Sequence, residues 1–448
     1  MRLIRLRLPI QIVFVAILAV ILGAAVWTTV QTTSSVKAAD SEQNGSTGIL
    51  TDVITTTVYM PLVSNDYQLL AKRIGYSAIT YPITRYPTIR NLSAGWYLDW
   101  GVQTAPIRPG GIEYAQMIRV HQKLACGDWT NANRSACPYA QPLDYNYAPS
   151  QAAIEAIARA NPGNLWYIGN EMDRVDWLVC EEYDASGNCP SGKLKSAGQD
   201  EMLPQTYARA YHDLYTIVKN ADPTARIGIG GVIQATPLRL QYLTIIWDTY
   251  KTLYGQDMPV DVWNVHNFVL REEKNGFGAE IPPGLPGNPT TGLYIGNDCT
   301  HTDPATFDKQ IRDFRQWMKA RGQQEKPLTV NEYGILFAHI PSAPNNNNGK
   351  CKINFGDETV VNNFMLWSFD YFLNTKDCAL GYTADDCRLV QRWLWFALDS
   401  TYQDANGQLV SGLNKYASLF NGTTLEMTKA GKLFQQFAQA NLDGLNEP

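Results

Sequence analysis

The chain has 448 residues, of which 45% are hydrophobic and 18% are charged. This composition excludes a disordered or collagen-like protein, because it supplies enough apolar surface for a large core. The 37 Lys and Arg residues against 42 Asp and Glu give a net charge of -5. Since the basic residues form no cluster, nucleic acid is not expected as a partner.

The first 39 residues have the features of an export signal. Three arginines precede an apolar run from Leu8 to Val30, and small residues follow this run. This order is typical of a secretory signal, yet the run also reaches the ~20 residues that span a bilayer. We expect an extracytoplasmic protein, either secreted after cleavage or tethered at the outer face of the cytoplasmic membrane through residues 8–30.

A spacer and one domain are expected after the signal. Residues 40–68 are rich in Ser, Thr and Gly, as in flexible linkers. The apolar segment Val58–Val63 inside this spacer has no assigned role; an edge strand and an interaction segment are both open. From residue 69 to 448 no second linker is visible, so a single domain is expected there.

Short apolar runs alternate with helical patterns through this domain. The expected strands are Arg73–Ile79, Ser93–Asp99, Tyr114–Val120, Asn164–Gly169, Arg226–Gly231, Val260–His266, Pro327–Asn331 and Gln391–Ala397. The expected helices are Pro149–Ala160, Pro204–Asn220, Leu238–Leu253, Pro304–Arg321, Glu358–Asn374 and Thr428–Leu442. Such alternation indicates a parallel sheet covered by helices, and eight units predict an α/β protein of the (β/α)8 TIM barrel class with long loops. A doubly wound open sheet is the alternative, which the missing glycine-rich nucleotide motif disfavours.

The eight cysteines fall into pairs that are close in sequence. An even number in an exported chain favours disulfide bonds, and the expected pairs are Cys126–Cys137, Cys180–Cys189, Cys378–Cys387 and Cys299–Cys351. Each short pair would staple one loop. The five histidines show no metal-ligand spacing and no CxxC is present, so neither a metal nor another cofactor is expected.

Two glutamates follow asparagine at the ends of apolar strands. Glu171 ends the fourth expected strand and Glu332 ends the seventh. Because the active site of a barrel lies at the carboxyl ends of its strands, both acids are expected in one cleft. Retaining cleavage of a glycosidic bond uses such a pair, one carboxylic acid to protonate the leaving oxygen and one carboxylate to attack the anomeric carbon. For either glutamate alone, a salt bridge or a cap is the alternative.

From about residue 73 to 442 the chain resembles glycoside hydrolase clan A. Within the clan it is most similar to the alkali-sensitive-linkage type cell-wall glycosidases of family 128. The segments that carry the resemblance are Gly95–Trp100, Asn170-Glu171 with Asp173, Asp261–His266 and Arg392–Phe396. The resemblance implies a retaining mechanism and a β-1,3-glucan or related β-glucan as the substrate.

The resemblance also implies roles for single residues. Glu171 matches the acid/base, Asn170 the ligand of the substrate's 2-hydroxyl group, and Glu332 the nucleophile. Two positions depart from the family 128 pattern: Met172 replaces a proline, and Phe268 replaces a tyrosine whose hydroxyl can contact the nucleophile. Tyr333 is expected to supply that hydroxyl instead.

Further site residues are expected near the strand ends. The resemblance places His266 beside the carboxylates, although a core position is the alternative. Trp395 is expected as a stacking floor for a sugar ring, with a core role as the alternative. Near the end of the second strand, Trp96, Asp99 and Trp100 are candidates for lining the substrate site. Asp173 is expected to shape its loop and, if close to Glu171, to raise the pKa of the acid/base.

The leading hypothesis is an exported retaining glycoside hydrolase that acts on a polysaccharide or oligosaccharide. The first alternative is a barrel that binds carbohydrate without catalysis. The second is a cell-surface scaffold that uses Val58–Val63 and the membrane tether.

Overall fold

The computed structural model describes residues 72–79, 81–127, 134–175, 178–180, 194–196, 199–274, 278–294, 301–336, 355–403, 409–411 and 414–443. The chain divides into two units, residues 1–66 and 67–448, and every described residue belongs to the second. The expected signal, the spacer and Val58–Val63 therefore lie outside the described residues. Among the helices that are described, none is both long and apolar enough to cross a membrane.

A ring of parallel strands forms the centre of the domain. In order around the ring the strands are β1 (Ile74–Ser77), β2 (Trp96–Leu98), β3 (Glu113–Tyr114) continuing as β4 (Gln116–Gln122), β6 (Leu165–Asn170), β9 (Arg226–Gly231), β10 (Trp263–His266), β11 (Leu328–Tyr333) and β12 (Arg392–Trp395). Strand β3 pairs with β2, whereas β4 pairs with β6, so this one stretch joins the two sheets. Bridges between Gly228 and Val262 and between Val232 and Val265 join β9 to β10. Since β12 pairs with β1, the ring closes, and the expected TIM barrel is confirmed.

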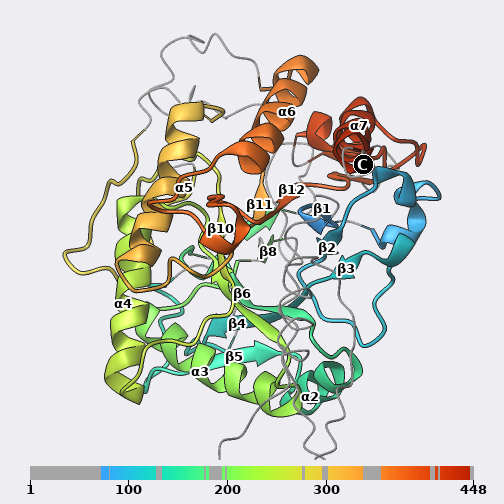
Figure 1. Ribbon diagram of the computed structural model, residues 1–448. Coiled ribbons are helices and arrows are strands. Elements are labelled where there is room, and N and C mark those ends of the chain that lie inside the picture. The colour runs from blue at the N-terminus through green and yellow to red at the C-terminus, as the bar shows by residue number, and fades with distance from the viewer. Residues whose placement is uncertain are drawn as a thin grey trace, which may run out of the picture. The chain divides into compact units, whose positions relative to one another are not determined.

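Helices cover the outside of the ring, as Figure 1 shows for α3 to α6. They are α2 (Gln151–Ala160), α3 (Pro204–Ala221), α4 (Pro237–Tyr254), α5 (Pro304–Lys319), α6 (Glu358–Asn374) and α7 (Lys429–Asp443). Proline begins α3, α4 and α5, where its fixed φ fits and no N–H is needed. Asp303 and Asp357 cap α5 and α6 by accepting bonds from backbone N–H groups of the first turn.

Shorter elements complete the described chain. Between β1 and β3 the described parts of the connections contain 3-10 turns in place of helices, η3 (Ile83–Arg85), η4 (Ile89–Leu92) and η5 (Pro109–Gly111). Strand β5 (Tyr145–Ala148) pairs antiparallel with β4, and two hairpins consist of β7 (Leu178–Cys180) with β8 (Leu194–Ser196) and β13 (Thr401–Gln403) with β14 (Leu409–Ser411). The predicted disulfides Cys126–Cys137 and Cys378–Cys387 are present. The other two predicted pairs include residues outside the described ranges.

Large side chains fill the barrel interior at the amino-terminal ends of the strands. A buried cluster from several strands consists of Trp96, Leu98, Ala115, Met117, Leu165, Tyr167, Val262 and Leu394. The indole Nε1 of Trp96 donates to the carbonyl of Arg73, just before β1, so this ring marks the barrel floor. Glu113 pairs with Arg226 at 2.6 Å and with Arg392 at 2.9 Å across the same end. The floor is therefore packed and closed by ion pairs.

Gly75 makes room for Trp96 on this floor. A Cβ added at Gly75 would lie 2.2 Å from the Trp96 carbonyl oxygen and 2.4 Å from Leu394 Cδ2. Because one of these atoms belongs to the backbone, rotation of a side chain cannot relieve the clash. We expect Gly75→Ala to lower the free energy of unfolding by about 1–3 kcal/mol or more, measured by denaturant unfolding. Gly101→Ala is the control, since its Cβ would meet only Asp99 Oδ1 at 3.5 Å; equal stability of the two variants would contradict the expectation.

Candidate active site

Three side chains from three strand ends meet at the carboxyl end of the barrel. Glu171 directly follows β6, His266 ends β10, and Glu332 lies near the end of β11. Register pairs His266 with Glu332, and β9 bridges β10 to β6. Because all these strands run parallel in one ring, residues as far apart in the sequence as Glu171 and Glu332 reach the same edge. The two glutamates thus lie in one site, as the sequence predicted.

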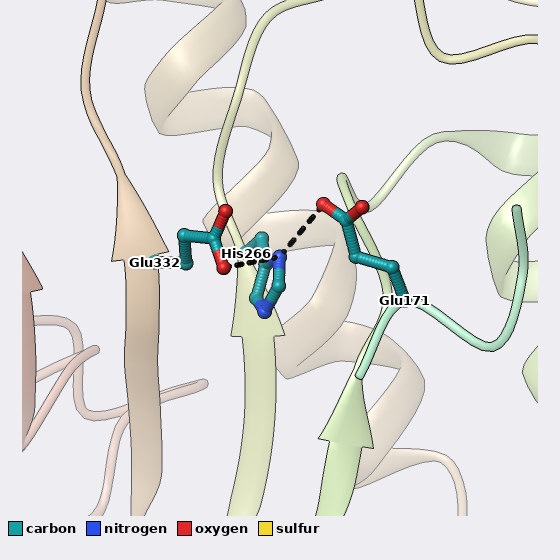
Figure 2. A group of neighbouring side chains, drawn as sticks. All are labelled: Glu171, His266 and Glu332. Carbon is teal, nitrogen blue, oxygen red and sulfur yellow. Dashed lines mark hydrogen bonds and ion pairs between the residues drawn. The ribbon is translucent and has the colours of Figure 1, made fainter. Parts of the chain in front are cut away.

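The imidazole of His266 lies between the two carboxyl groups (Figure 2). Its Nδ1 is 3.1 Å from Glu171 Oε1 and 3.7 Å from Glu332 Oε2. One oxygen of each carboxyl group and a ring nitrogen of His266 all lie within 4.8 Å of one another. All three side chains are buried. The predicted position of His266 beside the carboxylates agrees with this geometry.

A tight turn presents Glu171. Its backbone has a φ of 47°, a conformation unusual for a residue with a side chain. The Glu171 N–H donates to the Gly231 carbonyl at 2.9 Å, and its carbonyl accepts from the Arg174 N–H at 3.0 Å. The Arg174 side chain folds back, so that Nη1 lies 2.8 Å from Glu171 Oε2. The carboxylate is therefore held between a guanidinium and an imidazole.

Glu332 has a less positive environment. Trp100 Nε1 donates to Glu332 Oε2 at 3.3 Å, and His266 faces the same oxygen. The Trp100 ring packs edge-on against Phe396, with ring centroids 5.8 Å apart. Phe396 in turn packs edge-on against Phe268. An aromatic arc thus lies beside the carboxyl pair.

These neighbours shift the pKa values of the two glutamates in opposite directions. Burial alone would raise the pKa of Glu171, but the charge of Arg174 and the bond and charge of His266 outweigh it and lower that pKa to about 2. Burial raises the pKa of Glu332 to about 7; the Glu171 charge adds to this rise, while His266 and Trp100 oppose it. Burial would lower the pKa of His266, yet the charges of Glu332 and Glu171 raise it overall. The two carboxyl groups therefore titrate as a pair, and their surroundings favour the ionised form of Glu171 and the protonated form of Glu332.

The same three groups are also the set of side chains, among the described residues, that lie close enough to hold a metal ion. Arg174 already supplies a fixed positive charge 2.8 Å from Glu171. A second cation at this position would be repelled by the guanidinium and by a protonated His266. The arrangement therefore fits proton transfer and nucleophilic attack better than metal coordination.

Of the other predicted residues, Asn170 and Trp100 lie at the site. The Asn170 N–H donates to Asp200 Oδ2 at 2.9 Å, which fixes the end of β6. Its side-chain Oδ1 is buried without a hydrogen-bond partner among the described residues, as expected of a group that awaits water or a ligand. Asp99 lies at the end of β2 and accepts bonds from Gln103 Nε2 at 2.6 Å and from the Tyr114 hydroxyl. Its contacts are therefore structural.

Three predicted site residues lie elsewhere. Trp96 belongs to the barrel floor, at the opposite end from the carboxylates. Trp395 is fully buried on the outer face of β12, where its Nε1 donates to the Ala417 carbonyl at 2.7 Å, so it presents no face to a sugar. Tyr333 also points outward, packs against Phe307 and Phe372, and has its hydroxyl 3.3 Å from Ser368 Oγ. The expectation that its hydroxyl contacts the nucleophile is therefore wrong.

Two residues at the site were not predicted from the sequence. Phe396 takes the position beside the carboxylates that was assigned to Trp395, because neighbouring residues at a strand end face opposite sides. Arg174 was not predicted because its spacing from Glu171 is the only sign of it in the sequence. An arginine three residues after a glutamate in a turn can fold its side chain back onto that glutamate.

Comparison with known proteins gives distant similarities. No protein-family model and no curated protein sequence matches the chain. Among solved structures, the chain is similar to a family GH128 (subgroup I) endo-β-1,3-glucanase from Amycolatopsis mediterranei in complex with laminaritriose, with 14% identity, a TM-score of 0.43, and coverage of 82% of this chain and 99% of that chain. It is also similar to a glucosidase from Croceicoccus marinus, with 15% identity, a TM-score of 0.43, and coverage of 83% and 68%.

A third similar structure is a GH128 (subgroup VII) oligosaccharide-binding protein from Trichoderma gamsii, with 12% identity, a TM-score of 0.37, and coverage of 82% of this chain and 94% of that chain. Since all three TM-scores are below 0.5, the fold and the site described above rest on the strand pairing and side-chain distances of this chain.

Replacing Arg174 tests the electrostatics of the site. We expect Arg174→Gln to raise the pKa of Glu171, because a positive neighbour that favours the ionised carboxylate is removed. The carboxyl titration can be followed by carbon-13 NMR of labelled glutamate. Arg159→Gln is the matched control, since it breaks a 3.0 Å pair with Glu155 on the surface of α2. An unchanged Glu171 titration in Arg174→Gln would contradict the assigned cause of the shift.

Proposed function

We propose that the chain is an exported, retaining glycoside hydrolase that cleaves β-glycosidic bonds within a polysaccharide. The observation that carries this proposal is the buried carboxyl pair of Glu171 and Glu332, whose facing oxygens lie within 4.8 Å at the carboxyl end of a parallel barrel. Retaining enzymes separate their two carboxyl groups by about 5–5.5 Å, and inverting enzymes by roughly 6.5–9.5 Å, since a water must fit between them. The separation here favours retention.

The two glutamates take the roles that the sequence resemblance implies. Glu332 attacks the anomeric carbon while Glu171 gives its proton to the leaving oxygen, so that a covalent glycosyl-enzyme forms as the glycosidic bond breaks. Glu171 then takes a proton from water, the water attacks the same carbon, and the Glu332 carboxylate is released. Trp100 donates to Glu332 and orients it for attack. The unpartnered Asn170 Oδ1 is available for the 2-hydroxyl group of the sugar.

These roles require the shared proton to lie on Glu171 when substrate is bound, whereas the surroundings in the free protein favour the protonated form of Glu332. Because His266 Nδ1 faces an oxygen of each carboxyl group, a proton that moves from Glu332 to Glu171 has only a short distance to cross. The macroscopic pKa values belong to the pair, and the singly protonated pair is the active charge state whichever group carries the proton. Substrate that weakens the Arg174–Glu171 ion pair would move the proton to Glu171.

The substrate class follows from the residues that carry the family 128 resemblance. Asn170-Glu171 with Asp173 and the strand end at His266 support a β-glucan, with β-1,3-glucan as the first choice. Export rests on the three arginines and the apolar run from Leu8 to Val30. A cleaved signal and a retained tether give different mature amino termini, which terminal sequencing of the native protein separates.

A carbohydrate-binding barrel without catalysis is the second candidate. The observation that favours it is the ion pair between Arg174 and Glu171, since a carboxylate held in the ionised form cannot protonate a leaving group. Hydrolysis of a β-1,3-glucan oligosaccharide by the purified protein supports the first candidate, and binding without hydrolysis supports the second.

Substitution of each glutamate tests the roles separately. We expect Glu332→Gln to reduce kcat by several orders of magnitude on every substrate, because no covalent intermediate can form. Glu171→Gln should reduce kcat strongly on oligosaccharides but much less on dinitrophenyl glycosides, whose leaving group needs no proton. Steady-state kinetics on both substrate types makes this comparison, with Glu155→Gln on the exposed face of α2 as the control.

Proton NMR of the first product provides the stereochemical test. A β-anomer formed before mutarotation indicates retention, and an α-anomer indicates inversion. Equal losses on both substrate types in Glu171→Gln would contradict its role as the acid/base, and an α-anomer would contradict the retaining mechanism.

A further inference from the structure

A buried charge cluster lies behind the turn that carries Glu171. It consists of Asp173, Arg239 and Glu272, whose side chains are all fully buried. Asp173 belongs to the Glu171 turn, Arg239 to the first turn of α4, and Glu272 to the loop that follows β10. We call these three residues the Arg239 cluster. Burying three charges is costly, and apolar residues often stabilise a core as well or better, so such a cluster is not explained by stability alone.

Arg239 holds groups from two separate segments. Its Nε donates to Asp173 Oδ2 at 2.7 Å, while Nη1 donates to Glu272 Oε1. On the loop side, Nη2 also donates to the Ala279 carbonyl at 2.6 Å, and Nη1 to the Glu280 carbonyl at 3.2 Å. The guanidinium therefore has acceptors in both the Glu171 turn and the loop after β10. A lysine could not serve all of these acceptors at once, because its charge is a single point.

Asp173 fixes the Glu171 turn from behind. Both of its carboxylate oxygens lie 3.3 Å from the Ile233 N–H, just after β9. The preceding residue, Met172, has its carbonyl bonded by the Tyr242 hydroxyl and the Met202 N–H, each at 3.0 Å. Since Glu171 itself has a φ of 47°, the turn depends on these outside contacts to keep its shape. A shift of Asp173 would change the direction of the Glu171 side chain.

Glu272 fixes the loop in the same way. The Leu293 N–H donates to Glu272 Oε2 at 2.7 Å, and the Thr236 hydroxyl donates to Oε1 at 2.5 Å. Backbone bonds between Glu272 and residues 292 and 293 close the base of the loop. The start of the loop carries Phe268 and Leu270, which belong to the apolar cluster of Phe396 and Trp100 beside the carboxyl pair. The loop therefore connects the Arg239 cluster to a wall of the site.

We propose that Arg239 is a positioning residue that sets the Glu171 turn and the loop after β10 as one unit, by bonding Asp173 on one side and Glu272 on the other. This inference rests on the proposed function. The cluster then acts on Glu171 through the backbone of its turn, because Arg239 and Glu272 have their side chains behind this turn.

The charge of Asp173 contributes a second effect. Burial raises the pKa of Asp173, the charge of Arg239 opposes this rise, and the negative charge of Glu171 adds to it. The ionised Glu171 thus disfavours a second negative charge in the same turn, and Arg239 is the group that offsets this repulsion at Asp173.

Asp173→Asn tests the proposal with little change in shape. We expect kcat on a β-1,3-glucan oligosaccharide to fall ~10-fold or more, because acid assistance weakens, and kcat on a dinitrophenyl glycoside to change less than ~2-fold. Glu272→Gln should also lower kcat more on the oligosaccharide than on the dinitrophenyl glycoside, but by a smaller factor, since Glu272 acts on the turn through Arg239. In Arg239→Lys the charge stays but the several bonds do not, so the selective loss should persist.

Asp385→Asn is the matched control. Asp385 forms another buried ion pair, with Arg73, which precedes β1 at the amino-terminal end of the barrel. Its loss should lower the melting temperature without changing the ratio of the two activities. If Asp173→Asn lowers both activities equally, as a purely structural defect would, the proposal is overturned.

A measurement that does not depend on catalysis tests the role of Arg239 independently of the proposed function. If the wild-type protein hydrolyses neither substrate, the proposed function fails, and the carbon-13 titration of the Glu171 carboxyl group decides the positioning role. Asp173→Asn and Glu272→Gln should each shift the Glu171 carboxyl resonance, because the turn that carries Glu171 loses its support, whereas Asp385→Asn should leave it unchanged. An unchanged Glu171 signal in both cluster variants would overturn the inference.

Discussion

Two carboxyl groups whose oxygens lie within 4.8 Å in a buried site cannot both be ionised without positive charge beside them. This constraint accounts for much of the surrounding structure. His266 lies between the two acids, Arg174 folds back onto Glu171, and a guanidinium behind the turn neutralises Asp173. The positive groups are shared unequally, so the two chemically identical side chains differ in proton affinity. In the free protein the difference has the opposite sign to the proposed roles, so a bound substrate must change the surroundings of Glu171 before this residue can act as the acid.

Much of the fold could be predicted from the sequence. Strand β9 and helix α6 have the predicted bounds, and the other strands of the ring lie within or close to the expected ranges. Parallel barrel strands are buried on both faces, so they appear as continuous apolar runs. Helices α3 to α6 begin at proline or at an Asp cap, and these residues mark a helix start in the sequence. The 3-10 turns that replace helices between β1 and β3 were not predicted, because short irregular connections have no periodic pattern.

The direction of side chains at strand ends was harder to predict. The two glutamates and His266 were placed correctly, since each ends an apolar run. Trp395 and Tyr333 were assigned to the wrong face of their strands, because a shift of one residue along a strand turns a side chain to the opposite face. In β11 the pairing register shifts between Val330 and Tyr333, so regular alternation stops just where the site begins. The Arg239 cluster joins residues up to 99 positions apart (272 − 173 = 99), and no local pattern connects them.

The packed floor under the site determines from which side a ligand can approach the carboxyl pair. Trp96, Tyr167 and Leu394 fill the interior, and Glu113 with its two arginines closes the far end. A ligand of the carboxyl pair must therefore approach from the carboxyl ends of the strands. A ligand of the site does not use the amino-terminal face of the barrel. The domain can therefore be attached to a solid support or to another domain through this face, while the carboxyl ends of the strands stay accessible.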